Sequence, residues 1–440
     1  MPGSGQISVK SRLWLALGAG LLGLALGPQQ EAGALRAWPS LESPGPQAAG
    51  AIAWELAGKH LGERVTVRGT VVRAHRGDKV IHLNFREEWQ GTFQVVIFSQ
   101  AWCDFPTALE SFYLGKEILV SGWVKDYRGT PEMVVDSPAQ IPCADGTVVA
   151  ANPPLVPVSG ARLAPPPRDP GVKIVSWNLE NFFDGWDDPF REDERTEPAS
   201  ISAPRRQRIA DALRMLDADV VCLQEVENRF ALEEFVHVYL PESGYEVVLM
   251  EGNDPRGIDV ALLTRLPIDA VTSYRHRRFQ DRDGAEQHFQ RDLLRVRLGA
   301  PLNADVFVVH LKSQTGGEDA DRVREAEARA AVEILRAELE QNPQWRALVA
   351  GDFNEVLGAP TLDAFLNSTS QGGAALRDLC AGTKTPSYHQ APFISRIDFL
   401  LATPSLAREA KDAAIVDRLD GVDLKCSSDH YPVSARFTRK

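Results

Sequence analysis

The sequence predicts an α/β protein with two folded parts, a small all-β module followed by a larger α/β domain. Its 440 residues are more than one ordinary core needs. Between residues 51 and 145, short runs that alternate apolar and polar residues are separated by turn signals such as RGD and YRGT. From Val172 onward, apolar strand-like runs alternate with helical patterns. Residues 146–171 contain NPPLVPVSG and APPPRDPG, which predicts a semi-rigid Pro-rich linker between the parts.

The N-terminal segment, residues 1–27, is typical of a secretory signal peptide. Lys10 and Arg12 precede an apolar run over residues 13–26. The run is shorter than the about 20 apolar residues that a membrane-spanning helix needs. We therefore expect a secreted or periplasmic protein, and the alternative is a protein anchored by an uncleaved N-terminal segment. Residues 28–50 are rich in Pro, Gly, Ala and Ser, which predicts a disordered lead-in.

The chain has five cysteines, and export would permit disulfides. We expect pairs that each lie within one part of the chain, Cys103 with Cys143 and Cys380 with Cys426. Cys222 lies in the apolar run DVVCLQ, which predicts a buried free thiol. No two cysteines have CxxC spacing, so a structural zinc site is not expected.

The all-β module, residues 51–145, is predicted to hold five short strands with a helix before the fourth. This arrangement resembles an OB-fold, a small barrel that often binds oligonucleotides on one face. The expected strands are Val65–Ala74, Val80–Phe85, Phe93–Phe98, Ile118–Val124 and Met133–Val135, and the expected helices are Ala51–Leu61 and Ala108–Tyr113.

Basic and aromatic residues of the module are candidates for such a binding face. The alternative is that the tryptophans pack in the core or at an edge and that the cations are solvated. The net charge of −12 argues against a protein that simply coats nucleic acid, so contacts would come from local clusters. The candidates are Arg68, Arg73, Arg76, Lys79, Trp89, Trp123, Lys125 and Arg128.

In the α/β domain, residues 172–440, apolar strand-like runs repeatedly end in or just precede Asn, Asp, Glu or His. Side chains at strand ends converge into a crevice in layered α/β folds. Carboxylates hold a hard cation such as Mg²⁺, and Asn adds a ligand without adding charge that repels phosphate. His moves protons near neutral pH or binds phosphate. The residues are Asn178, Glu225, Asp259, His310, Asp352, Asn354, Asp398, Asp429 and His430.

Six sequence blocks in this domain resemble the endonuclease/exonuclease/phosphatase superfamily, the fold of deoxyribonuclease I and exonuclease III. WNLEN, LQEVEN, HLKS, GDFNE, RIDFLL and SDHYPV occur here in the family order. The resemblance implies a four-layer α/β sandwich, with a β-sandwich core flanked by helices. Together with the signal peptide and the OB-like module, it suggests a secreted bacterial nuclease of this superfamily.

The resemblance also implies a metal site with a divalent cation, Mg²⁺ first and Mn²⁺ or Ca²⁺ as alternatives. Glu225 would be the principal ligand. Asn178 would help to position metal and phosphate, with turn capping as its alternative. Asp429 would be a second ligand or an outer-shell acid.

The same resemblance implies roles around the attacking water and the phosphate. Asp352 would orient or deprotonate the water, and Asn354 would bind the phosphate. His430 would contact the scissile phosphate, with Asp398 holding its ring in the useful tautomer. His310 would act from the other side as general acid or phosphate ligand.

Four further interpretations rest on weaker signals. Asp259 would orient His310, or would be only a turn or salt-bridge acid. Arg256 would touch a substrate phosphate, or would be a surface residue. The basic run at residues 274–278 would line a nucleic-acid groove, although such runs are usually solvated. Lys312, with Arg322 and Arg324 in an expected helix over 321–341, would grip phosphate near His310, or the helix would be a solvated amphipathic element.

Three functions are compatible with these residues. The first is a nuclease that hydrolyses DNA or RNA, favoured by the OB-like module and the local basic run. The second is a phosphatase or a sphingomyelinase-like phospholipase of the same superfamily, although no apolar hairpin for a membrane stands out in the sequence. The third is a binding protein on an inactive fold, which is opposed by the presence of Glu225, Asp352 and His430.

Overall fold

A computed structural model describes most of the chain. The expected signal peptide and lead-in, apart from Gly50, and nearly all of the expected linker lie outside the described residues. No helix in the described part has the length and apolar character that crossing a membrane requires. The described residues are 50–105, 108–146, 171–186, 201–367 and 375–438.

The N-terminal module holds two sheets around one apolar core. A three-stranded sheet has the order β1–β2–β6, and a five-stranded sheet has the order β3–β4–β5–β8–β7. Side chains such as Val67, Ile81 and Val95 fill the core between them. The strands are β1 (Ile52–Ala53), β2 (Arg64–Thr70), β3 (Arg73–Arg76), β4 (Val80–Asn84), β5 (Gln94–Phe98), β6 (Glu117–Trp123), β7 (Lys125–Tyr127) and β8 (Thr130–Val134).

Two expectations for this module are corrected. The run Val65–Ala74 is two strands, because the chain leaves β2 after Thr70 and begins β3 at Arg73 in the other sheet. The expected helix Ala51–Leu61 is strand β1 followed by the 3₁₀ helix η1 (Trp54–Lys59). The helix before β6 is confirmed as α1 (Leu109–Tyr113), with the 3₁₀ helix η2 (Ser99–Asp104) before it.

The OB-like barrel is not confirmed. A closed barrel needs an unbroken ring of hydrogen-bonded strands, and the strands that the structure describes in this module stay in two separate ladders. The sequence pattern therefore predicted most of the longer strands, but it missed β1 and β7, merged β2 with β3 and did not show how the two sheets are arranged.

The α/β domain is built on two six-stranded mixed sheets. The first sheet has the order β11–β12–β10–β9–β24–β21 and the second has the order β13–β16–β17–β18–β20–β19. The first comprises β9 (Val172–Phe182), β10 (Val220–Val226), β11 (Glu246–Leu249), β12 (Asp259–Thr264), β21 (Ala410–Ile415) and β24 (Val433–Phe437). The second comprises β13 (Ile268–Ser273), β16 (Leu294–Leu298), β17 (Ala304–His310), β18 (Ala347–Asp352), β19 (Arg377–Asp378) and β20 (Asp398–Ala402).

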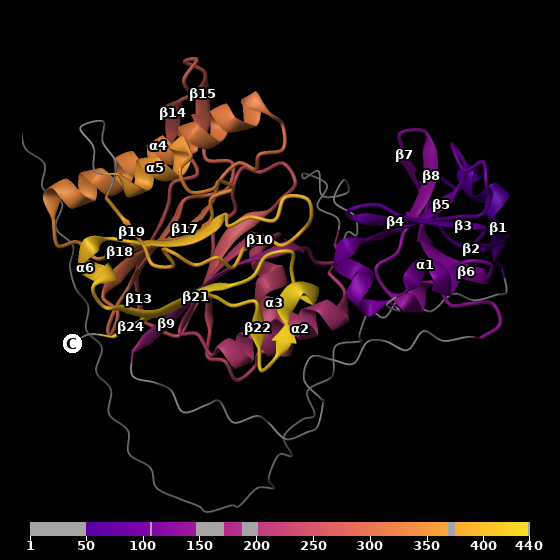
Figure 1. The fold of residues 1–440 in the computed structure, drawn as a ribbon, viewed down its shortest axis with the longest axis horizontal. Coiled ribbons are helices and arrows are strands. Elements are labelled where there is room, and N and C mark those ends of the chain that lie inside the picture. Colours follow the sequence, from indigo (N-terminus) through magenta and orange to yellow (C-terminus); the bar gives the residue numbers. More distant parts are fainter. Residues whose placement is uncertain (1–49, 106–107, 147–170, 187–200, 368–374, 439–440) are drawn as a thin grey trace, which may run out of the picture. The chain divides into compact units, whose positions relative to one another are not determined.

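Helices cover the outer face of each sheet, which gives four layers (Figure 1). One core joins the facing sheets and continues under α2 (Ala203–Leu216) and α3 (Arg229–Tyr239). A second core lies between the second sheet and the helices α4 (Glu318–Gln341) and α5 (Pro360–Leu366). Smaller elements are β14 (Arg278–Gln280), β15 (Glu286–His288), η3 (Pro138–Gln140), α6 (Pro404–Ala407), β22 (Arg418–Leu419), β23 (Val422–Asp423) and η5 (Leu424–Cys426).

Strand direction brings the predicted polar residues to one edge of the two sheets. β9 runs parallel to β10, and β17 runs parallel to β18 with His310 opposite Asp352. β20 runs antiparallel to β18, so Asp398 at its start lies opposite Asp352 at the end of β18. β12 runs antiparallel to β10 and likewise starts at this edge with Asp259. The chain just before β24, antiparallel to β9, adds His430.

The disulfide expectations are wrong. Cys103 of η2 is bonded to Cys426 of η5, across 323 positions of sequence. Cys143 and Cys380 are buried free thiols, and Cys222 is buried and free as predicted. The expectation failed because it assumed that each pair stays within one part of the chain, whereas the bond joins the N-terminal module to the α/β domain.

Candidate active site

Glu225 is turned into the site by an irregularity at the end of β10. The pairing of β10 with both neighbouring strands shifts between Gln224 and Val226, and Glu225 has a φ of 60°. This bulge points its carboxylate out of the ladder. Its Oε2 accepts a hydrogen bond from the backbone N–H of Asn181 at 2.9 Å, and its Oε1 accepts one from Asn178 Nδ2 at 3.3 Å.

Asp352 is held beside Glu225 by Asn178 and Asn354. Asn178 Nδ2 also donates to Asp352 Oδ2 at 3.1 Å, so this one amide bridges both carboxylates. Asp352 Oδ1 accepts the backbone N–H of Asn354 at 2.7 Å. Burial raises the pKa of Asp352 to about 7, helped by repulsion from the Asp398 carboxylate. The group therefore gains and loses its proton near neutral pH.

The GDFN turn explains why glycine precedes Asp352. Gly351 has a φ of 152°, and a Cβ there would lie 1.9 Å from the carbonyl oxygen of Val309 in the adjacent strand. Asn354 has a φ of 51° and donates Nδ2 to the carbonyl oxygen of Leu311 at 3.0 Å. The close approach of β17 and β18 therefore requires glycine.

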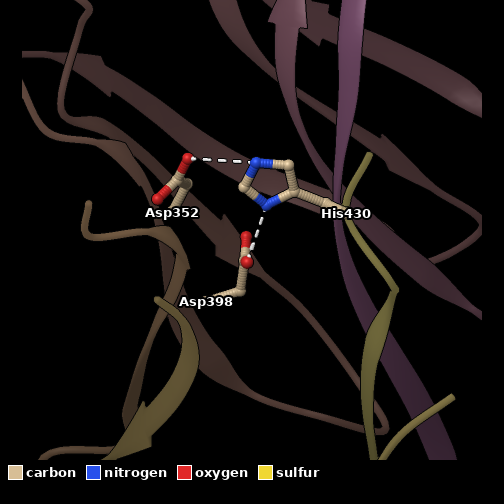
Figure 2. Close-up of side chains that lie close together, drawn as sticks. All are labelled: Asp352, Asp398 and His430. Carbon is tan, nitrogen blue, oxygen red and sulfur yellow. Dashed lines mark hydrogen bonds and ion pairs between the residues drawn. The ribbon is translucent and has the colours of Figure 1, made fainter. Parts of the chain in front are cut away.

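His430 is oriented by Asp398 (Figure 2). Its Nδ1 donates to Asp398 Oδ2 at 2.8 Å, and its Nε2 faces Asp352 Oδ2 at 3.8 Å. Trp177 Nε1 donates to the carbonyl oxygen of His430 at 2.9 Å, which fixes the backbone. Burial alone lowers the pKa of His430, but the charge and hydrogen bond of Asp398, with Asp352 and Asp429, raise it well above the usual value. The shift favours the protonated ring.

His310 lies on the other side of the carboxylates, and its pKa is shifted in the opposite direction from that of His430. Its Nε2 is 3.8 Å from Glu225 Oε1 and 3.7 Å from Asp352 Oδ2. Burial lowers the pKa of His310 well below its usual value, and the charge of Arg291 adds to this effect. Its buried Nδ1 has no hydrogen-bond partner among the described residues, so orientation by Asp259 stays a prediction.

Glu180 and Arg205 form a buried pair next to Asp429 that the sequence analysis missed. Glu180 Oε2 accepts the backbone N–H of Asp429 at 3.0 Å and lies 3.3 Å from Arg205 Nη2. Burial and the charge of Asp429 raise the pKa of Glu180 to about 8. Glu180 is the acidic residue within the block WNLEN. Its position in that block could have identified it as a candidate site residue.

Arg256 lies near the site through a small ion network. Its backbone N–H donates to Asp254 Oδ1 at 2.9 Å, and Arg291 Nε lies 3.0 Å from Asp254 Oδ2. Burial raises the pKa of Glu225, but the neighbouring side chains of His310, Arg256 and His430 overcome this and lower it to about 2. Arg256 therefore acts electrostatically on Glu225, while contact with a substrate phosphate stays a prediction.

Several other predicted basic residues are engaged in ion pairs. Arg324 lies 2.9 Å from Glu355, and Arg322 lies 3.2 Å from Asp281. The predicted helix over 321–341 is confirmed as α4, which begins slightly earlier at Glu318. In the run at 274–278, Arg277 pairs with Glu333 and Arg278 pairs with Glu286. These pairings favour the structural alternative for these residues.

The donor set fits a hard divalent cation. Glu225 is ionised at neutral pH because its pKa is near 2, and its carboxylate shares the amide of Asn178 with Asp352. Carboxylate oxygens are ligands that Mg²⁺ prefers. Asn178 turns its Nδ2 toward the two carboxylates, while its Oδ1 accepts the backbone N–H of Glu180 at 2.9 Å. Atoms of Asp352, Asp398 and His430 also lie within 4.8 Å of one another. We favour the Glu225 side, because Asp398 and His430 already hydrogen-bond each other.

Comparison with known proteins gives one family and several structures. The model of the Endonuclease/Exonuclease/phosphatase family matches residues 175–430, more than half of the 440-residue chain. The human Nocturnin catalytic domain with bound sulfate is 17% identical, with a TM-score of 0.44 over 61% of this chain and 94% of that chain. Truncated TDP2 of Caenorhabditis elegans is 17% identical, with a TM-score of 0.42 over 61% and 97%. SmcL is 17% identical, with a TM-score of 0.43 over 61% and 99%. No curated protein matches the chain.

Proposed function

The chain belongs to the endonuclease/exonuclease/phosphatase family, and from this premise we propose that it is an exported, Mg²⁺-dependent nuclease of DNA or RNA. The observation that carries the proposal is the meeting of Glu225, Asp352 and His430 at one edge of the two sheets. Asn178 Nδ2 lies 3.3 Å from Glu225 and 3.1 Å from Asp352, and His430 Nε2 lies 3.8 Å from Asp352. Such a cluster suits hydrolysis of a phosphodiester.

Glu225 would hold the cation, with Asp429 as a further or outer ligand. Asn178 would add its amide oxygen after its side chain turns, because Oδ1 here accepts the Glu180 N–H. A bound divalent cation neutralises charge on the phosphate and makes water more acidic. Asp352 is the base that we assign to the attacking water. Its pKa of about 7, raised by burial and by Asp398, lets it accept a proton near neutral pH. The Asn354 N–H on Asp352 Oδ1 leaves Oδ2 to face the site.

His430 would bind the scissile phosphate as a cation. Asp398 on Nδ1 keeps Nε2–H directed into the site and stabilises the imidazolium. A fixed positive charge there becomes more favourable as negative charge develops on the phosphoryl oxygens. Asn354 and Arg256 are the further phosphate contacts that we propose.

His310 would be a phosphate ligand. The sequence left general acid and phosphate ligand open, and we propose the phosphate ligand because the lowered pKa of His310 favours a neutral ring. A ring that is neutral at neutral pH has no spare proton to give to a leaving oxygen. A neutral imidazole still donates one hydrogen bond from a ring nitrogen.

A phospholipase activity is the second candidate, because an apolar loop tip lies beside the site. Tyr388 and Ser395 exchange backbone hydrogen bonds and close a loop that carries Phe393 and Ile394, which are 71% and 58% exposed. The Tyr388 ring lies against His430. The sequence analysis found no such apolar hairpin, because only two large apolar residues form it. Exposed apolar side chains next to a phosphodiesterase site suit entry into a lipid surface.

Parallel assays separate these activities. Purified full-length protein would be incubated with supercoiled plasmid, single-stranded RNA, inositol phosphates and sphingomyelin vesicles, each with Mg²⁺ or with EDTA. Plasmid nicking or RNA cleavage that requires Mg²⁺ supports the nuclease. Release of phosphate or phosphocholine with both nucleic acids intact supports the second candidate. Glu225→Ala should abolish the activity while the melting temperature stays within a few degrees of the wild-type value.

A further inference from the structure

The N-terminal module places one lysine at the catalytic site of the α/β domain. Lys79 lies in the turn between β3 and β4, and the Ser99 N–H donates to its carbonyl oxygen at 2.9 Å. Lys79 Nζ donates to the hydroxyl of Tyr388 at 2.6 Å and lies 5.3 Å from the centre of that ring. Its Nζ is also 3.9 Å from Asp429 Oδ2. The contacts therefore cross from residue 79 to the last catalytic block of the chain.

Tyr388 connects this lysine to His430. The two ring centres lie 5.0 Å apart, and the backbones of Tyr388 and His430 form a β-bridge. The Tyr431 N–H also donates to the carbonyl oxygen of Ser387 at 2.7 Å. Tyr388 is therefore fixed on the backbone that carries His430, and Lys79 is one side chain away from that imidazole.

Covalent and buried contacts keep the module in this position. The Cys103–Cys426 disulfide attaches it four positions before His430. Next to the disulfide, Asp104 forms a buried ion pair with Arg208, with Arg208 Nη2 3.2 Å from Asp104 Oδ2. Ser202 Oγ donates to the same carboxylate oxygen at 3.1 Å. These contacts attach the module to the α/β domain. The position of the Lys79 turn therefore does not depend only on the weak ion pair between Lys79 and Asp429.

Charge explains why a lysine at this position would matter. The site gathers five buried or nearly buried acids, Glu180, Glu225, Asp352, Asp398 and Asp429. A nucleic-acid strand brings further negative charge in each phosphate, which makes the approach unfavourable without cations. The Lys79 side chain is 52% exposed, and its ammonium has three donors, of which Tyr388 takes one. Donors therefore remain for a ligand at the solvent side.

We propose that Lys79 belongs to the active site and binds the phosphate next to the scissile one in a nucleic-acid strand. This inference rests on the proposed nuclease function. The neighbouring phosphate is favoured over the scissile one because Lys79 lies beyond Tyr388 and Asp429, whereas His430 faces Asp352 directly. In this proposal the N-terminal module contributes a substrate-binding residue to the enzyme.

A binding experiment tests Lys79 without requiring hydrolysis. The Kd of full-length protein for a fluorescein-labelled single-stranded DNA would be measured by fluorescence anisotropy in EDTA at several salt concentrations. Lys79→Met should weaken binding about five- to tenfold, as for loss of one charged contact. The slope of log Kd against log salt should fall by about 0.7, the value for one phosphate contact on a single strand. Lys79→Arg should restore most of the affinity.

Lys59→Met is the matched control, because Lys59 is an exposed lysine of the same module in η1. Its Kd should change less than about twofold. Equal losses for both variants would reduce Lys79 to general electrostatic attraction and overturn the proposal. Unchanged affinity and salt slope for Lys79→Met would also overturn it.

Hydrolysis of two substrates separates substrate contact from simple attachment of the module. Bis(4-nitrophenyl) phosphate has one phosphodiester and no neighbouring phosphate. With Mg²⁺ or Mn²⁺, Lys79→Met should raise KM for an oligonucleotide about five- to tenfold and leave both constants for the small diester within about twofold. Equal losses on both substrates would mean that Lys79 only helps to attach the module to the α/β domain, and this result would overturn the proposal. If wild-type protein hydrolyses neither substrate, the nuclease proposal fails, and the anisotropy titration still decides on Lys79.

Discussion

At the scale of single residues, the pair of Asp398 and His430 gives the most direct test of the site. Asp398→Asn keeps the shape of the side chain but removes the carboxylate that accepts Nδ1–H at 2.8 Å. We expect kcat to fall by up to about 10⁴-fold, the loss known when an orienting aspartate is changed to asparagine. Steady-state kinetics with His430→Ala and the double variant should show losses that do not add.

The control for this substitution is Asp269→Asn, an exposed aspartate on β13. Its kcat should stay within about twofold of the wild-type value, because surface substitutions rarely exceed about 0.5 kcal/mol. Full additivity of the Asp398 and His430 variants would mean that the two residues act independently.

Gly351 tests the backbone that carries Asp352. A methyl group at 351 would meet the Val309 carbonyl oxygen at 1.9 Å, so β17 and β18 must separate. Gly351→Ala should lower the free energy of unfolding by about 3 kcal/mol or more and remove activity. Gly358→Ala is the control, since Gly358 also has a positive φ but has no atom within 4 Å of its Cβ position. Its cost should stay near 1 kcal/mol in denaturant titrations; equal costs would contradict the steric argument.

At this residue scale the sequence predicted which side chains would meet. Asn178, Glu225, Asp352 and His430 each lie at or near the end of an apolar strand, and strand direction brings them together. Their catalytic roles stay predictions. Arg205 was missed because it lies in the helix α2, where an arginine ordinarily reads as solvated. It is 2% exposed and donates to the carbonyl oxygen of Leu179, a contact between distant segments that no local pattern encodes.

At the scale of elements, Glu327 couples the helix α4 to the segments after β17 and before β16. Its carboxylate accepts the backbone N–H groups of Gln290 at 2.9 Å and Lys312 at 2.8 Å. Burial raises the pKa of Glu327 from 4.5 to about 7. Protonation therefore favours the folded state, and this contribution is complete below pH 4.5 and is lost as pH rises through 7.

The free energy of unfolding should accordingly show a Glu327 contribution that falls as the pH rises. Between about pH 5 and about pH 8, this contribution amounts to at most about 3 kcal/mol. Glu327→Gln cannot titrate, so its free energy of unfolding should lose less over that interval than the wild-type value. Urea titrations at both pH values would measure this difference. Parallel pH dependence of the two proteins would show that Glu327 keeps the same protonation in both states.

Element prediction was reliable where alternation was regular and failed where the chain changed sheet. β4 and β5 lie within a residue of their predicted bounds. The run Val65–Ala74 continued its alternation past the point where the chain leaves β2. Its apolar pattern continues because both sheets face the same core, so periodicity alone does not mark the break.

At the scale of the whole molecule, the disulfide is the link that sequence reasoning assigned wrongly. Pairings were expected within each part of the chain. The spacing of cysteines does not show which surfaces of the folded protein meet, so it could not reveal a bond between the two parts. Cys103–Cys426 closes a loop across 323 positions, and cross-linking so long a loop removes much of the freedom of the unfolded chain.

Removing the Cys103–Cys426 disulfide should weaken the attachment of the N-terminal module to the α/β domain. Replacing Cys103 and Cys426 together by serine should lower the free energy of unfolding by about 2–4 kcal/mol. It should also reduce the penalty of Lys79→Met on oligonucleotide affinity, because the turn is then less firmly placed. Dithiothreitol should lower the melting temperature of the wild type but not that of the double-serine variant. Equal sensitivity of both proteins would show that reduction acts elsewhere.

The position of this cystine has a consequence for the surroundings in which the protein can work. Cys426 lies four positions before His430, so opening the bond loosens the segment that carries the imidazole as well as the attachment of the module that carries Lys79. A reducing environment would therefore disturb the candidate site and the module together.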